Sequence, residues 1–73
     1  MDTVQEKMKE YIDWVCSGVR HTDDEWLEKE AEIDAFIIDN QLTPEQTHDF
    51  AAGAGEIMAM TCSAIREIRK KNP

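Results

Sequence analysis

The chain has few residues of several types, and each shortage excludes a class of protein. Its 73 residues include two cysteines, three glycines and two prolines. Two cysteines cannot form the dense disulfide framework that stabilises small secreted domains. No apolar run reaches membrane-spanning length, and the first six residues, Met-Asp-Thr-Val-Gln-Glu, do not have the pattern of a signal peptide. We therefore expect a cytoplasmic protein without a membrane segment.

Signatures of catalysis are also missing. The chain has no Gly-rich phosphate loop and no strand that could carry a nucleophile elbow, and it offers little room for a substrate pocket. A metal site would have to use Cys16, His21, His48 and Cys62, whose spacing lacks the close ligand pairs of zinc sites. We therefore expect no enzyme activity, no cofactor and no metal.

Basic residues are scarce relative to acidic ones. The chain has sixteen Asp and Glu residues but only eight Lys and Arg residues, which gives a formal net charge of −8. Residues 1–50 hold fourteen acidic and four basic side chains, whereas residues 51–73 hold two acidic and four basic ones. Such a charge repels nucleic acid and anionic membranes and attracts basic protein surfaces. It is consistent either with solubility alone or with the selection of a basic partner.

The sequence contains many residues that typically begin or end helices. Thr3 with Glu6, Thr22 with Glu25 and Thr43 with Gln46 form capping boxes. Gly18 and Asn40 are placed to end the two preceding helices in the left-handed conformation. We predict helices over about 3–18, 23–39 and 44–70. The fold class is all-α, a single helical domain over 1–73 in which a long C-terminal helix packs against two shorter helices as a small three-helix bundle.

The long C-terminal helix contains one anomaly, the sequence Ala-Ala-Gly-Ala-Gly at 51–55. Glycine in a helix interior costs about 1 kcal/mol relative to alanine. Either the helix kinks or breaks at this point, or the small residues admit a close neighbour. We favour the close neighbour.

The second predicted helix is unusually acidic, with seven Asp and Glu against Lys29 between residues 23 and 34. Glu30 and Asp34 fall within its apolar arc, where they either meet Arg66, Arg20 or solvent, or receive a basic residue of a partner. On the first helix, Trp14 lies off the apolar stripe and is either a packing contact or an exposed anchor. The predicted partner-binding residues are Trp14, Asp24, Glu25, Glu28, Glu32 and Asp39.

One stretch resembles a known family. Leu42-Thr43-Pro44-Glu45, followed by Phe50 and Ala51-Ala52, is similar to the corresponding stretch of the Hha-type nucleoid modulators. The resemblance covers about thirty residues, and Gly53 and Gly55 depart from the family's pattern. It implies a small helical protein that binds a DNA-organising partner protein.

These observations favour a non-enzymatic regulatory or inhibitory module. We expect it to bind a basic protein surface of nucleic-acid-handling machinery, such as RNA polymerase or a nuclease, and not to bind nucleic acid or membranes directly. A phage-encoded origin fits its small size and charge. The alternatives are a self-associating helical structural subunit, including a homodimer, and a nucleoid-protein adaptor.

Overall fold

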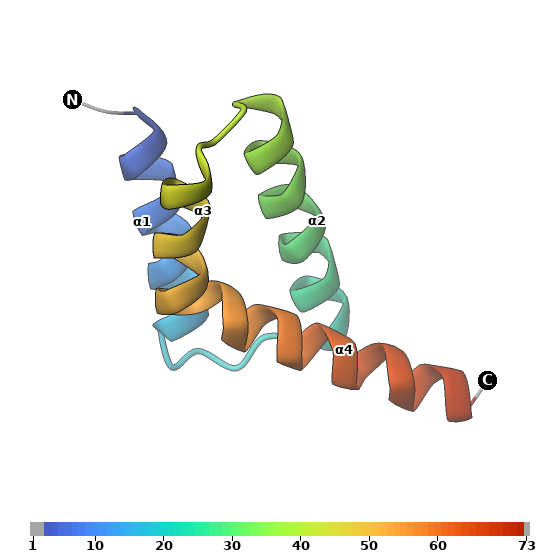
Figure 1. The fold of residues 1–73 in the computed structure, drawn as a ribbon. Coiled ribbons are helices and arrows are strands. Elements are labelled where there is room, and N and C mark those ends of the chain that lie inside the picture. The colour runs from blue at the N-terminus through green and yellow to red at the C-terminus, as the bar shows by residue number, and fades with distance from the viewer. Residues whose placement is uncertain (1–2, 73) are drawn as a thin grey trace.

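The structure is a computed structural model that describes residues 3–72. It contains α1 (Thr3–Cys16), α2 (Asp23–Asp39), α3 (Pro44–Phe50), a π-helical turn η1 (Ala51–Gly55) and α4 (Glu56–Lys71). The last three elements follow one another without interruption and form one long C-terminal helical segment (Figure 1). The predicted all-α fold, with two shorter helices and a long C-terminal one packed against them, is therefore confirmed.

Local hydrogen bonds fix where the helices begin. The Thr22 hydroxyl accepts from the Glu25 amide at 3.2 Å, and the Glu25 carboxylate accepts from the Thr22 amide at 3.0 Å. Thr43 and Gln46 make the same reciprocal pair at 3.1 and 2.9 Å. Each pair satisfies two amides at a helix start, so the capping boxes predicted at Thr22 and Thr43 are confirmed. The third, at Thr3, is not confirmed, because Thr3 is itself the first residue of α1.

The helix ends agree with the sequence at one of two positions. Gly18 has a φ of +77°, as expected of a left-handed residue after α1. Asn40, however, has a φ of −97°, and Gln41 takes the left-handed conformation with a φ of +49°. The prediction for Asn40 was wrong because its side-chain amide caps α2 instead, donating to the Phe36 carbonyl at 2.9 Å. The turn to the left-handed region consequently falls one residue later.

The π-helical turn bends the C-terminal segment. The Glu56 amide donates to the Ala51 carbonyl, an i to i+5 bond that makes room for one extra residue in the turn. Figure 1 shows the result: α3 lies alongside α1, whereas α4 runs away across the lower end of α2. The anomalous sequence at 51–55 thus keeps its backbone hydrogen bonds but changes the direction of the helix.

The small residues of η1 also admit a close neighbour, as we favoured from the sequence. Ala54 is fully buried, and a β-carbon added to Gly53 would lie 3.7 Å from Ile12 Cδ1 of α1. Gly55 has a different neighbour, because an added β-carbon there would lie only 3.1 Å from two carbons of the Phe50 ring. Both interpretations of the glycines therefore hold: α1 packs closely on η1, and the helix kinks.

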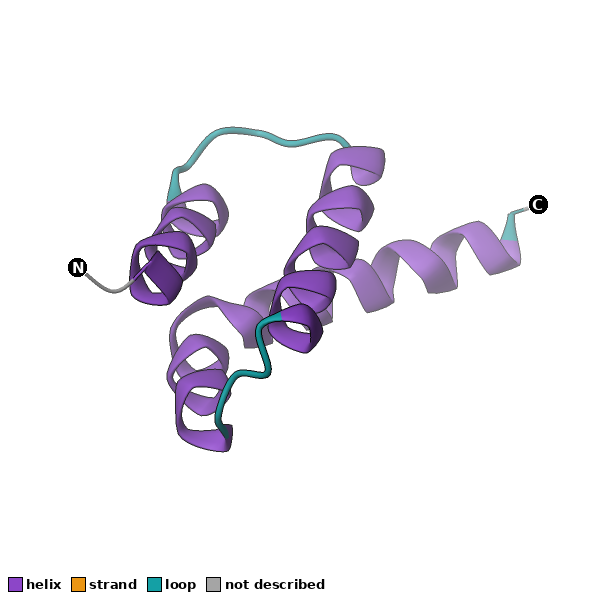
Figure 2. Cartoon of the chain, turned by 90° about the horizontal axis from the view of Figure 1, so that it is seen from above, coloured by secondary structure: helices purple, strands orange, loops and turns teal. Residues whose placement is uncertain are grey.

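The core collects buried side chains from every helical element. Its members share an inward position on their own helix, and they are Met8, Tyr11, Ile33, Phe50, Ala54, Met58, Cys62 and Ile65. In Figure 2, seen from above, α1 and α3 lie on one side of α2, and α4 passes behind α2. Over residues 3–72, no helix combines the length and apolarity that a bilayer crossing would require.

The two glycines of η1 should respond differently to alanine. In Gly53→Ala the new methyl group meets Ile12 at an ordinary contact distance, so the helix propensity of alanine should raise the free energy of unfolding by about 0.5–1 kcal/mol. In Gly55→Ala the methyl group must displace the Phe50 ring, which offsets that gain. Thermal unfolding followed by circular dichroism should therefore rank Gly53→Ala above Gly55→Ala in Tm. The reverse order would contradict the described packing of Phe50.

Candidate partner-binding surface

Three aromatic rings join the end of α1 to the start of α2. Trp14 and His21 stack with ring centroids 3.6 Å apart and planes within 6° of each other. Trp26 meets Trp14 edge-on at 5.0 Å and His21 edge-on at 5.6 Å. His21 is also held by a 3.0 Å hydrogen-bond contact between its Nε2 and the Trp14 carbonyl oxygen. Trp14 is thus half-buried, with one face packed inside the molecule.

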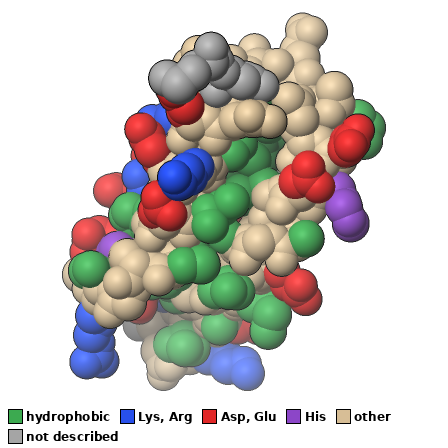
Figure 3. Space-filling model, turned by 90° about the vertical axis from the view of Figure 1, so that its left-hand side faces the viewer, with side chains coloured by type: hydrophobic (Ala, Val, Ile, Leu, Met, Phe, Trp, Pro, Cys, Tyr) green, Lys and Arg blue, Asp and Glu red, His purple; other side chains and the backbone are tan. Residues whose placement is uncertain are grey.

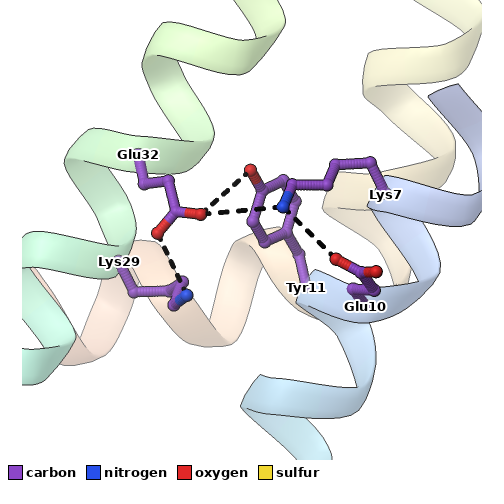
Figure 4. A network of polar contacts seen from close by, with 5 residues as sticks. All are labelled: Lys7, Glu10, Tyr11, Lys29 and Glu32. Atoms are coloured by element: carbon purple, nitrogen blue, oxygen red, sulfur yellow. Dashed lines mark hydrogen bonds and ion pairs between the residues drawn. The ribbon is translucent and has the colours of Figure 1, made fainter. Parts of the chain in front are cut away.

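Beside the rings, a network of charged and polar side chains connects α1 to α2 (Figure 4). Glu32 is its centre: it accepts from Lys29 Nζ at 3.0 Å, lies 3.9 Å from Lys7 Nζ, and accepts from the Tyr11 hydroxyl at 3.4 Å. Lys7 also pairs with Glu10 at 3.3 Å. The hydrogen bond from Lys29 lowers the pKa of Glu32, and burial raises the pKa of Tyr11. Glu32 therefore stays ionised and fixes both lysines.

The tryptophan and the charged network meet in one shallow groove of about 210 Å³, which we call the acidic groove. Its lining comes from α1 and from successive turns of α2, namely Trp14, Glu25, Glu28, Lys29 and Glu32. Lys29 lies across it, with Nζ 5.4 Å from the centre of the Trp14 ring. Four of the six predicted partner-binding residues are therefore brought together around a lysine.

The other two predicted residues lie elsewhere. Asp24 faces α4 and pairs with Arg69 at 2.7 Å. Asp39 is the last residue of α2, about 20 Å along the helix axis from Glu25. The acidic residues of α2 thus divide between the acidic groove, the contact with α4 and the far end of the helix.

Sequence reasoning left the neighbours of Glu30 open, and the structure identifies one of them. Glu30 forms an ion pair with Arg66 of α4. Burial, followed by the charge of Glu30, raises the pKa of Asp34 above its ordinary value. Burial also raises the pKa of Cys62 to about 11, so this thiol is a packing group with little thiolate character. The carboxylate of Glu30 therefore forms its ion pair within the molecule.

Lys29 is the site residue that sequence reasoning did not single out. It is the only basic residue of α2, and in the sequence it stands out only as the exception within an acidic run. The signal that could have identified it is the spacing of Lys29 and Glu32, three residues apart on a helix, since such pairs are neighbours on the helix surface. Its contact with Trp14 could not be read from spacing because it crosses between two helices.

A second groove lies between α1 and α3. It has a volume of about 240 Å³, and its apolar lining is Val4, Met8, Ile12 and Phe50. Figure 3 shows hydrophobic side chains along this side of the molecule, bordered by acidic and basic groups. None of the predicted partner-binding residues lines it.

The candidate metal ligands are not gathered into a site. Cys16 is exposed at the end of α1 and Cys62 is buried in α4, and both thiols are free. Over residues 3–72, no group of three or more His, Cys, Asp or Glu side chains is arranged to hold a metal ion. In comparisons with known proteins, no family model, curated protein or solved structure matches the chain.

The capping box at the edge of the acidic groove should make stability depend on pH. Hydrogen bonds from the backbone and side chain of Thr22 lower the pKa of Glu25. A carboxyl group whose pKa is lower in the folded state stabilises the fold above its unfolded pKa of about 4.5, and this contribution disappears as the pH falls through the folded value. Glu25→Gln should therefore destabilise the protein at pH 7 and have a smaller effect at pH 3, as measured by urea denaturation.

Glu28→Gln provides the matched control for this measurement. Glu28 lies one turn further along α2 and makes no capping hydrogen bond. Its substitution removes no capping hydrogen bond, so it should destabilise the protein less than Glu25→Gln at pH 7. Equal losses of stability in the two variants at pH 7 would argue against the capping role of Glu25.

Proposed function

We propose that this chain is a non-enzymatic regulatory or inhibitory module that binds a basic protein surface through the acidic groove. The observation that supports this most is the meeting of Trp14 with Glu25, Glu28 and Glu32 in one groove. An aromatic ring beside several carboxylates suits the side chains of lysine and arginine. The ring offers apolar contact to the long aliphatic stem while a carboxylate accepts the hydrogen bonds of the cationic group.

Lys29 illustrates this chemistry within the molecule itself. Its ammonium group pairs with Glu32 at 3.0 Å while lying over the rings of Trp14 and Tyr11. Glu28 lines the same groove without an ion pair to any residue in the range 3–72. A basic side chain of a partner can therefore bind at Glu28 without first displacing an internal cation.

The proposed class of partner follows from the charge of the whole chain. Fourteen of the sixteen acidic residues lie in the first fifty, so the groove is set in a strongly negative surface. Proteins that handle nucleic acid, such as RNA polymerase or a nuclease, carry basic clefts that bind phosphate groups. A compact acidic protein would compete with nucleic acid for such a cleft, and electrostatic attraction would speed the encounter.

Charge reversal at Glu28 tests the proposal with little risk to the fold, because Glu28 is exposed and unpaired. We expect Glu28→Lys to weaken binding to the partner at least tenfold, since a repulsive contact replaces an attractive one. The measurement is retention of bacterial lysate proteins on the immobilised chain, eluted along a salt gradient. Inhibition of transcription by purified RNA polymerase and inhibition of a purified nuclease are then measured with the same variants.

Asp49→Lys is the matched control, since it makes the same change in net charge beside the apolar groove. If both variants lose binding equally, net charge and not the acidic groove determines association. If neither loses it, the acidic groove is not the binding surface. Retention of a nucleoid protein, with no effect on polymerase or nuclease, would favour the adaptor alternative.

A further inference from the structure

An apolar stripe runs along α4 on a face that no other part of the described chain covers. Its large members are Ile57, Met60 and Ile68, whose exposed fractions are 49%, 67% and 60%. With Ala64 they are spaced by three or four residues, the pattern of one continuous helix face, which we call the α4 stripe. The core-facing residues of α4, Met58, Cys62 and Ile65, lie on a different face. Helix α4 is therefore apolar on two faces, and only one of them is buried.

We propose that the α4 stripe is the interface between two copies of this chain, with the two α4 helices packed antiparallel. The shape of the molecule supports a second copy. Figure 1 shows α1, α2 and α3 on one side of α4, which leaves the other side of that helix open along its length. A partner helix can thus lie along the α4 stripe without meeting the rest of the fold.

The exposed area is close to what such a dimer needs. The chain exposes 5376 Å². A compact monomer of its mass, 8.4 kDa, should expose about 4,600 Å². The excess of roughly 750 Å² is similar to the area of about 800 Å² that each partner buries in a standard interface.

Side-chain size favours a close crossing at the centre of α4. Ala59, Ser63 and Ala64 form a shallow recess bordered by Met60 and Glu67. In an antiparallel pair centred on Ala64, the small residues let the two backbones approach, and Met60 of each copy lies opposite Ile68 of the other. This is the packing of large side chains into spaces left by small ones that helix pairs require.

The charges of α4 select the antiparallel orientation. Glu56 begins the helix, whereas Lys70 and Lys71 lie at its end. The same central crossing places Glu56 of one copy opposite these lysines of the other, whereas a parallel pair would place the lysines against one another. The net charge of −8 opposes self-association in general. However, α4 carries more basic than acidic residues, so it is the helix on which two copies repel each other least.

Sedimentation equilibrium over about 1–200 µM protein tests the proposal. We expect a dimer that dissociates on dilution and whose Kd rises at least tenfold in Met60→Glu. Ile38→Glu is the matched control, because Ile38 is 73% exposed but belongs to α2. That variant should dimerise like the unmodified chain, and circular dichroism should show that both variants keep their helices. A monomer at every concentration, or equal effects of the two substitutions, would overturn the proposal.

A charge exchange tests the orientation separately. Glu56→Lys alone, and the double variant Lys70→Glu with Lys71→Glu, should each weaken the dimer several-fold, because each places like charges opposite one another. Combining the three substitutions should restore the dimer. Additive weakening in the combined variant would overturn the antiparallel arrangement. Because Glu28 and the acidic groove are not part of α4, neither result depends on the proposed function.

Discussion

The fold depends on the i to i+5 hydrogen bond that turns the C-terminal segment at Ala51–Gly55. The extra residue in the turn redirects the chain, so that α3 lies along α1 and α4 crosses α2 (Figure 1). Glycine and alanine allow this turn because Phe50 folds back against Gly55 and Ile12 approaches Gly53. The bend therefore lets a short chain enclose a core with few elements.

The bend also separates the two surfaces on which the functional proposals rest. Acidic residues concentrate on α1 and α2, where the side chains of Trp14, Lys29 and Glu32 form one side of the molecule. Helix α4 meets α2 through two ion pairs, Arg66 with the mostly buried Glu30 and Arg69 with the exposed Asp24. An exposed pair such as Arg69 with Asp24 contributes little stability, whereas the buried side chains of Cys62 and Ile65 pack α4 against the core. The outer face of α4 is then left apolar.

Sequence patterns predicted the local features well because those features depend on residues close together in the chain. The capping boxes at Thr22 and Thr43, and the left-handed Gly18, each follow from side chains within one helical turn. Contacts between helices could not be predicted in this way. The stack of Trp14 on His21 depends on how the link 17–22 folds back, and the pairing of Arg66 depends on the bend.

The acidic groove likewise combines features that helical spacing predicts with contacts between helices that it does not predict. The row of carboxylates on α2 was predictable from helical spacing, and the off-stripe position of Trp14 marked it as unusual. Spacing alone could not show that Asp24 turns toward Arg69, or that Lys29 lies between Glu32 and the Trp14 ring. Those outcomes follow from the angles at which α1 and α4 meet α2. To predict these contacts, one would have to know that the helix changes direction at η1. The glycines at 51–55 indicated only that the helix either kinks or admits a close neighbour there.

The most direct test of the bend is a nuclear Overhauser experiment on the π-helical turn in solution. The bent structure predicts cross-peaks from the Phe50 ring protons to the α-protons of Gly55, five residues later, and from the Ile12 methyl groups to the α-protons of Gly53. Both pairs are close in the bent structure. An uninterrupted α-helix from Pro44 to Lys71 with neither cross-peak would contradict the bend, and with it the separation of the acidic groove from α4.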